Sequence, residues 1–366
     1  MLASRTAGPV WRSVASDSSV LDFLRATAVC LVLADHFVEA TRNSNEWWFA
    51  ERLGWMGVML FFVHTSLVLM GSLERSQADG IALLQQFYVR RAFRIYPLSI
   101  VVVLAVIAFH LPVAAWYFQP AVASVQTAVA NVLLVQNLVY APSVLGPLWS
   151  LPLEVQMYVL LPFLYWLVRK GTRWDVALVL WFVSIVLAVV QPLVTDRANV
   201  LQYAPCFMSG VIAYCLSKRV SARWPFWMWG LTLTAVMWVF VAMTANQANA
   251  HVMLASWGLT VTVGWLIPRF RETSSWMLQR TCSTIARYSY GIYLTHMIAL
   301  WVAFVVLGRS SLAIRTVAGS SLTVLLPALA YHVIEAPGIR FGSYLARRLV
   351  NRALLPRPLA CAEGPR

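Results

Sequence analysis

The stretch LDFLRATAVCLVLADHF, residues 21–37, decides how the rest of the chain is interpreted. It is apolar and close to the roughly 20 residues that a helix needs to cross a bilayer. It also contains Asp22, Arg25, Asp35 and His36, and ionisable groups inside a membrane are costly and commonly functional. The stretch therefore predicts a transmembrane helix that turns its polar groups toward other protein.

The composition of the whole chain agrees with a membrane protein. Hydrophobic residues make up 60% of the 366 residues and charged residues 11%, and the mean hydropathy is +0.70. A soluble domain is about half apolar and a quarter charged. The net charge of +14 does not indicate nucleic-acid binding, because the basic residues lie in short connections between apolar segments rather than in a stripe with aromatic residues.

The expected fold class is an all-α polytopic membrane protein with about ten transmembrane helices. We place them at 20–39, 54–73, 95–118, 148–168, 174–194, 199–217, 224–246, 250–267, 288–307 and 312–334. Residues 1–19 form a cytoplasmic N-terminal segment, 20–335 one membrane domain, and 336–366 a basic cytoplasmic tail. If both termini are cytoplasmic, 22 of the 28 lysines and arginines lie on the inner side, as the positive-inside rule expects.

One outer connection, 119–147, carries no charged residue and is too apolar for a solvated loop. We expect a re-entrant or interfacial segment, since irregular backbone at membrane depth must be buried in protein.

Arg25 and His36 are candidates for a functional pair on the first helix. Eleven residues along a helix cover about 16 Å and three turns, so both side chains point to nearly the same face. A neutral imidazole oriented by a carboxylate is the usual general base for a hydroxyl. Glu39 or a group on another helix would orient it. The structural alternative is a histidine hydrogen-bonded between helices.

Two further stretches contain candidate residues. YVRRAFRIYP, 88–97, places Arg90, Arg91 and Arg94 close together, either to bind phosphates or only because cytoplasmic ends are basic. LGPLWSLPLEVQMYVLLP, 145–162, places Glu154 within a span, with Tyr158 one turn later. Glu154 would accept a hydrogen bond from a sugar hydroxyl or orient His36.

The remaining histidines and the cysteines give weaker indications. His64 and His110 are typical of core groups, whereas His296 and the pair His332 and Glu335 lie beside aromatic residues or helix ends. No metal site is expected, because no histidines at i, i+4 spacing accompany a carboxylate, and the five cysteines form no C-x-x-C pair.

Taken in order, these motifs resemble the membrane acyltransferase-3 family, the bacterial O-acyltransferases of cell-surface polysaccharides and lipid-linked sugars. The resemblance rests on six stretches: LDFLRATAV…DHF, GWMGVMLFFV, RRAFRIYP, LWSLPLEVQMYVLLP, YSYGIYLTHM and HVIEAPGIRFG. Thr65-Ser66 stands where the family commonly has Ser-Gly, Phe23 replaces a Gly, and Ala336 replaces an Arg.

The resemblance implies transfer of an acyl group, usually acetyl, from cytoplasmic acyl-CoA to a sugar hydroxyl at the bacterial inner membrane. His36 and Glu154 would be catalytic, with His36 acting as general base or as a covalent acyl carrier. Arg25, Arg90, Arg91 and Arg94 would bind the phosphates of acyl-CoA, which is a substrate and not a permanently bound cofactor. The acceptor, a polysaccharide or lipid-linked sugar, would contact Tyr158, Trp149 and His296.

Two rival functions remain open from the sequence. A proton-coupled saccharide exporter would use His36 and Glu154 as a relay, although the chain shows no repeated halves. A glycosyltransferase would need acidic residues in outer loops, which are scarce here. The acyl group, the acceptor, a homo-oligomer and polysaccharide-assembly partners are not decided by the sequence.

Overall fold

A computed structural model describes residues 18–41, 48–76, 78–112, 123–169, 173–245 and 247–354. Three of the predicted segments lie wholly or partly outside these ranges. They are most of the N-terminal segment (1–17), the end of the third predicted span with the start of the uncharged connection (113–122), and the last part of the tail (355–366).

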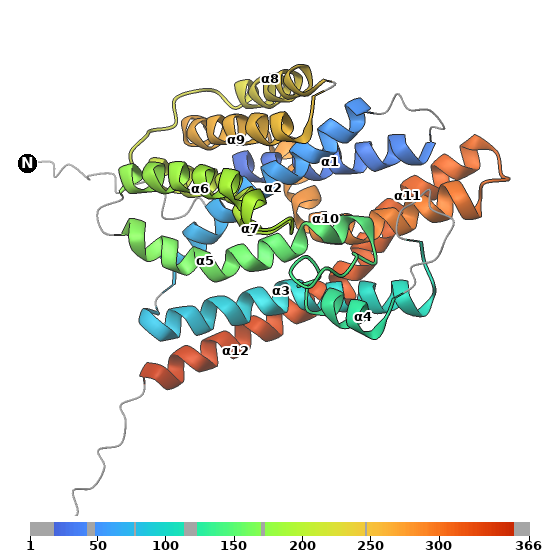
Figure 1. Ribbon diagram of the computed structural model, residues 1–366, viewed down its shortest axis with the longest axis horizontal. Coiled ribbons are helices and arrows are strands. Elements are labelled where there is room, and N and C mark those ends of the chain that lie inside the picture. The colour runs from blue at the N-terminus through green and yellow to red at the C-terminus, as the bar shows by residue number, and fades with distance from the viewer. Residues whose placement is uncertain are drawn as a thin grey trace, which may run out of the picture.

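The described residues form an assembly of helices, and no strand is present among them (Figure 1). The first half contains α1 (Ser19–Thr41), α2 (Trp48–Glu74), α3 (Gly80–Ala108), α4 (Val125–Val132), the 3₁₀ turn η3 (Gly146–Trp149), α5 (Leu151–Arg169) and α6 (Trp174–Val194). The second half contains α7 (Val200–Ser217), α8 (Trp227–Thr244), α9 (Asn249–Leu266), the 3₁₀ turn η4 (Ile267–Arg269), α10 (Trp276–Trp301), the π turn η5 (Val302–Val306), α11 (Leu312–Ala330), the π turn η6 (Tyr331–Glu335) and α12 (Ala336–Leu354).

The expected all-α polytopic fold is confirmed. Nine helices within the described ranges are long and apolar enough to cross a membrane, and they correspond to the second through tenth predicted spans. The first predicted span is α1, which has the necessary length of 23 residues but carries Asp22, Arg25, Asp35 and Glu39. Which ends face the cytoplasm stays a prediction.

Helix α3 begins much earlier than the predicted span. Asp79 accepts a hydrogen bond from the backbone of Gly80 and starts the helix there, and Pro97 is tolerated inside it. The sequence placed the start of this span at 95, with the arginines before it interpreted as a basic cytoplasmic end or a phosphate site. Arg90, Arg91 and Arg94 therefore lie in the middle of a 29-residue helix, where they reach the interior of the protein.

Two other boundaries differ for related reasons. Helix α10 begins at Trp276 rather than at 288, with Ser275 accepting a hydrogen bond from Leu278 as its cap. The segment expected as a basic tail from 336 is helical as far as Leu354, and α12 runs beside α3 (Figure 1). A helix with basic side chains on one side and a packed opposite face has no continuous apolar run to predict it.

The N-terminal end of α1 is fixed by a single carboxylate. Glu272 accepts hydrogen bonds from the hydroxyls of Ser18 and Ser19 at 2.7 and 2.5 Å and from the backbone of Val20 at 3.2 Å. A negative charge at a helix N-terminus is favourable and satisfies otherwise unpaired N–H groups. This contact fixes the axial position of α1, and with it the positions of Arg25 and His36.

The described part of the uncharged connection, 123–147, folds into the protein. Asn131, Leu134, Gln136 and Leu145 are buried. The Asn131 amide donates to the carbonyls of Thr127 and Pro142, and Gln136 donates to the carbonyl of Leu148. These bonds satisfy irregular backbone away from water, so α5 can begin inside the protein next to the cavity described below.

Candidate active site

A polar cavity lies between α1, α2, α3, α5 and α10. Charged and polar side chains converge on it from all five helices. Its polar lining residues are Arg25, His64, Thr65, Arg91, Arg94, Ser150, Glu154, Tyr158, Ser289, Tyr290 and Tyr293. Three helices, α1, α3 and α5, therefore bring the sequence-predicted groups together: Arg25, Arg91, Arg94, Glu154 and Tyr158.

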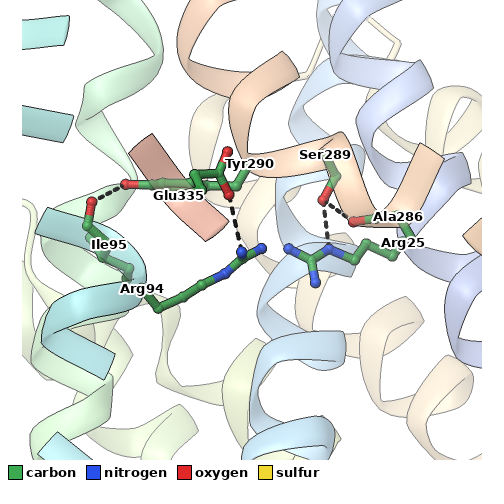
Figure 2. Close-up of polar contacts among 7 residues, drawn as sticks. All are labelled: Arg25, Arg94, Ile95, Ala286, Ser289, Tyr290 and Glu335. Atoms are coloured by element: carbon green, nitrogen blue, oxygen red, sulfur yellow. Dashed lines mark hydrogen bonds and ion pairs between the residues drawn. The ribbon is translucent and has the colours of Figure 1, made fainter. Parts of the chain in front are cut away.

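Two arginines face each other across this cavity. Figure 2 shows the guanidinium groups of Arg25 and Arg94 pointing toward one another. Arg25 donates from Nε to the hydroxyl of Ser289 at 2.6 Å, whereas Arg94 forms an ion pair with Glu335 at 3.0 Å (Figure 2). The Glu335 side chain is fully buried, so this pair fastens η6 to α3.

The other two predicted arginines, Arg90 and Arg91, are adjacent on α3 but line different pockets. Arg91 lines the main cavity and also a small neighbouring pocket, and its Nε is buried with no hydrogen-bond partner among the described residues. Arg90 lines only the smaller pocket, beside Ser72, Ser76 and Gln86. The structure thus places Arg91 in the main cavity with Arg25 and Arg94, whereas Arg90 lies outside that cavity, in the smaller pocket.

Glu154 lies with the arginines. Its carboxylate accepts hydrogen bonds from Thr65 at 2.8 Å and Tyr158 at 3.2 Å, and it is attracted by Arg25 and Arg91. The cavity and its edge thus contain three guanidinium groups and two carboxylates, and the net charge is positive when all five are ionised. They are Arg25, Arg91 and Arg94 with Glu154 and Glu335. Of the two roles predicted for Glu154, contact with a bound hydroxyl or orientation of His36, this position favours the first.

His36 contacts a different partner, His296 of α10. Nε2 of His296 lies 3.2 Å from Nδ1 of His36, and the two ring centroids are 4.9 Å apart. Arg25 lines the cavity, while His36 lies near the other end of the same helix beside this second histidine. Tyr293 connects the two regions, because it lines the cavity and its ring lies 6.2 Å from that of His296.

Trp149 belongs to an aromatic cluster above the cavity. Its ring stacks on Trp55 with centroids 5.6 Å apart and an interplanar angle of 17°, and Tyr203 completes the cluster. The next residue, Ser150, lines the cavity and shares a hydrogen bond of 2.7 Å with the hydroxyl of Tyr293. Trp149 is therefore beside the cavity, half-buried, with an aromatic face already occupied by Trp55.

Sequence reasoning missed several groups of this site. His64 was taken as a core histidine, yet it lines the cavity, and Thr65 bonds the predicted Glu154. Tyr290 and Tyr293 were visible only as an aromatic motif, although their spacing from Ser289 places all three near one face of α10. Glu335 was singled out from the sequence together with His332, but its partner Arg94 was not predicted.

No group of three His, Cys, Asp or Glu side chains suitable for a metal ion was found in the part of the chain that the structure describes. The polar groups that line the cavity are guanidinium, carboxylate, imidazole and hydroxyl groups.

The helical fold and the buried charged cavity define a multi-pass membrane protein with an interior binding site. The sequence model of the acyltransferase domain of the acyltransferase-3 family matches residues 19–332, most of the chain, and the protein belongs to this family. It is therefore a membrane acyltransferase. None of the curated proteins and none of the solved structures matches the chain significantly. The exporter that the sequence left open gains no support.

Proposed function

We propose that this protein transfers an acyl group, acetyl in its natural reaction, from cytoplasmic acyl-CoA to a hydroxyl of a bacterial exopolysaccharide or lipid-linked oligosaccharide. The observation that carries the proposal is the pair of guanidinium groups, Arg25 and Arg94, aimed at each other inside the protein (Figure 2). Like charges repel strongly where water is scarce, and an anion between them removes the repulsion.

The phosphates of acyl-CoA have the chemistry that such a site recognises. A guanidinium group binds a phosphate through two parallel hydrogen bonds, and Arg91 adds a third cation with a buried Nε free to donate. Arg25 is more available than Arg94, because its bonded partner is the neutral Ser289 whereas Arg94 is held by the carboxylate of Glu335. We assign the donor to Arg25, Arg91 and Arg94, with Arg90 at the margin.

The acyl transfer itself is assigned to His36. The imidazole takes the proton of the acceptor hydroxyl while the hydroxyl oxygen bonds to the thioester carbon. The carbon–sulfur bond then breaks, and the thiolate of coenzyme A takes the proton back from the imidazolium. General-base catalysis of this kind contributes about 10²–10⁴-fold. In the covalent variant the imidazole first carries the acyl group, and trapping a labelled acyl group on the protein separates the two routes.

The acceptor is assigned to the side of the cavity formed by Glu154, Tyr158 and Ser150. A carboxylate bonded to Thr65 and Tyr158 is placed to accept a hydrogen bond from a sugar hydroxyl. Trp149 lies next to this wall and presents an aromatic edge, while His296 is displaced from it toward His36. The proposed location is the bacterial inner membrane, with the donor arriving from the cytoplasm.

Mass spectrometry of surface glycans from a gene-deletion strain tests this proposal. We expect glycans lighter by one acyl group per modified sugar, with the loss reversed by the wild-type gene and not by His36→Ala. The mass difference names the acyl group and the fragment that carries it names the acceptor. Unchanged glycans and lipid-linked sugars in the deletion strain, with the protein present in the parent strain's membrane, would contradict the proposal.

A further inference from the structure

Three of the ring nitrogens of His36 and His296 have hydrogen-bonding neighbours. His296 is 1% exposed, and both of its ring nitrogens have neighbours: Nδ1 lies 2.9 Å from the carbonyl of Ile292, and Nε2 lies 3.2 Å from Nδ1 of His36. Nδ1 of His36 also lies 2.9 Å from the carbonyl of Val32.

These distances determine which nitrogens carry protons. A backbone carbonyl only accepts hydrogen bonds, so Nδ1 of His296 is the donor to Ile292. In neutral His296 the proton is then on Nδ1, and Nε2 is an acceptor. Nδ1 of His36 faces two acceptors, this nitrogen and the Val32 carbonyl, so it must carry the proton. The lone pair of neutral His36 is therefore on Nε2.

We propose that His296 is a positioning residue which holds His36 with Nε2 unprotonated and stabilises the imidazolium formed when Nε2 takes a proton. It performs the task that an orienting carboxylate performs behind a catalytic histidine, but with a neutral ring. This rests on the proposed function, because it specifies which atom of His36 reacts.

The proton balance of the step is complete without any further group. The acceptor proton goes to Nε2 of His36 and returns to the coenzyme A thiolate, while Nδ1 keeps its proton throughout. Positive charge on His36 strengthens the bond from Nδ1 to His296, since charge-assisted hydrogen bonds are stronger than neutral ones. In the covalent variant Nε2 bonds to the thioester carbon and coenzyme A leaves as the thiolate. The acceptor oxygen then bonds to the acyl carbon, the bond to Nε2 breaks, and the acceptor proton goes to the thiolate.

The geometry of α10 explains how this pair is held beside the cavity. Ser289, Tyr293 and His296 follow one another at spacings of four and three residues and share one face of the helix. Ser289 holds Arg25, and His296 contacts His36, so α10 contacts both functional residues of α1. Tyr293, between them, is fastened by its hydroxyl to Ser150 and to the Pro147 carbonyl.

Two substitutions of His296 separate positioning from simple packing. In His296→Gln the side-chain carbonyl occupies the place of Nε2 and still accepts from His36, so we expect kcat within about tenfold of wild type. His296→Phe keeps an aromatic ring but has no acceptor, and we expect kcat to fall by about 10²-fold with the KM for acyl-CoA unchanged. His251→Phe, an exposed position at the start of α9, is the matched control and should leave both constants unchanged.

Equal loss of kcat in the Gln and Phe variants, with acyl-CoA binding intact in both, would contradict the proposal. So would wild-type kcat in His296→Phe.

A measurement that needs no acyl transfer tests the protonation pattern directly. The protein is labelled with ¹⁵N-histidine in lipid nanodiscs at mildly alkaline pH, and the signals of His36 are assigned by their loss in His36→Gln. We expect His36 to be protonated at Nδ1 and unprotonated at Nε2. Protonation at Nε2 would overturn the proposal even if the protein acylates sugars, whereas the expected pattern with no acyl transfer would overturn only the proposed function.

Discussion

Helix α1 connects two polar regions, one around Arg25 and one around His36, and their charges are balanced in different ways. Around Arg25 the charges are left partly uncompensated, with guanidinium groups facing each other in one cavity. Around His36 the groups are uncharged rings whose donors and acceptors match. The first arrangement is typical of a site that binds a charged ligand, and the second of a site that must keep one atom in a defined protonation state.

This difference predicts that the two regions affect different steps. Changes around Arg25 should alter the binding of acyl-CoA, and changes around His36 should alter the rate of transfer once acyl-CoA is bound.

The largest effect is expected for His36→Ala. Removing the general base should lower kcat by about 10²–10⁴-fold, because the hydroxyl then attacks without transferring its proton to an imidazole. Transfer of radiolabelled acetyl from acetyl-CoA to isolated glycan measures the rate. A rate equal to that of wild type would remove His36 from the mechanism.

A smaller effect is expected for Arg25→Gln, which removes one of the two facing guanidinium groups. Hydrogen bonds to charged groups contribute about 1.5–3 kcal/mol, so KM for acetyl-CoA should rise roughly 10- to 10²-fold with kcat little changed. Arg25→Lys should recover only part of the affinity, since an ammonium lacks the planar fork. Steady-state kinetics with varied acetyl-CoA provide the test, and a pure loss of kcat would place Arg25 with the chemistry instead.

The helical fold could be predicted well because each span is specified by a continuous run of residues in the sequence. Runs of about 20 apolar residues specify spans wherever they occur, and all ten expected segments correspond to helices. The starts of α3 and α10 were misplaced because they depend on the caps Asp79 and Ser275, which sequence does not distinguish from ordinary loop residues.

The candidate site could be predicted only residue by residue. Arg25, Arg91, Arg94 and Glu154 were visible as charges in apolar surroundings, and the cavity that they share confirms that they lie together. The contact of His36 with His296 joins residues 260 positions apart, and no spacing rule connects them. The partners of Thr65 and Glu335 could not be named for the same reason, since they lie on other helices.

The ion pair between Arg94 and Glu335 gives a third, smaller test. Removing one partner of a buried pair leaves an uncompensated charge, whereas removing both does not. We expect Arg94→Gln and Glu335→Gln each to destabilise the protein, and the double variant to be more stable than the sum of the single losses by about 0.5–3 kcal/mol. Thermal unfolding in detergent measures all four proteins, and strict additivity would show that the pair contributes nothing to stability.

The smallest effect on activity is expected where α7 packs on the cavity wall of α2. A Cβ at Gly210 would overlap the backbone oxygen of Val63, next to His64 and Thr65. We expect Gly210→Ala to cost about 1–3 kcal/mol of stability and to weaken acetyl-CoA binding slightly. Gly258→Ala meets no atom within 4 Å and should be neutral or slightly stabilising. Equal unfolding temperatures for the two variants would show that α2 and α7 tolerate a larger separation.

The central claim is that Arg25 binds the donor and His36 performs the chemistry. Calorimetric titration of coenzyme A into the purified protein in nanodiscs tests it most directly, using wild type, Arg25→Gln and His36→Ala. The account predicts the same affinity for wild type and His36→Ala, and an affinity at least about tenfold weaker for Arg25→Gln. Unchanged binding by Arg25→Gln, or equal losses in the two variants, would contradict it.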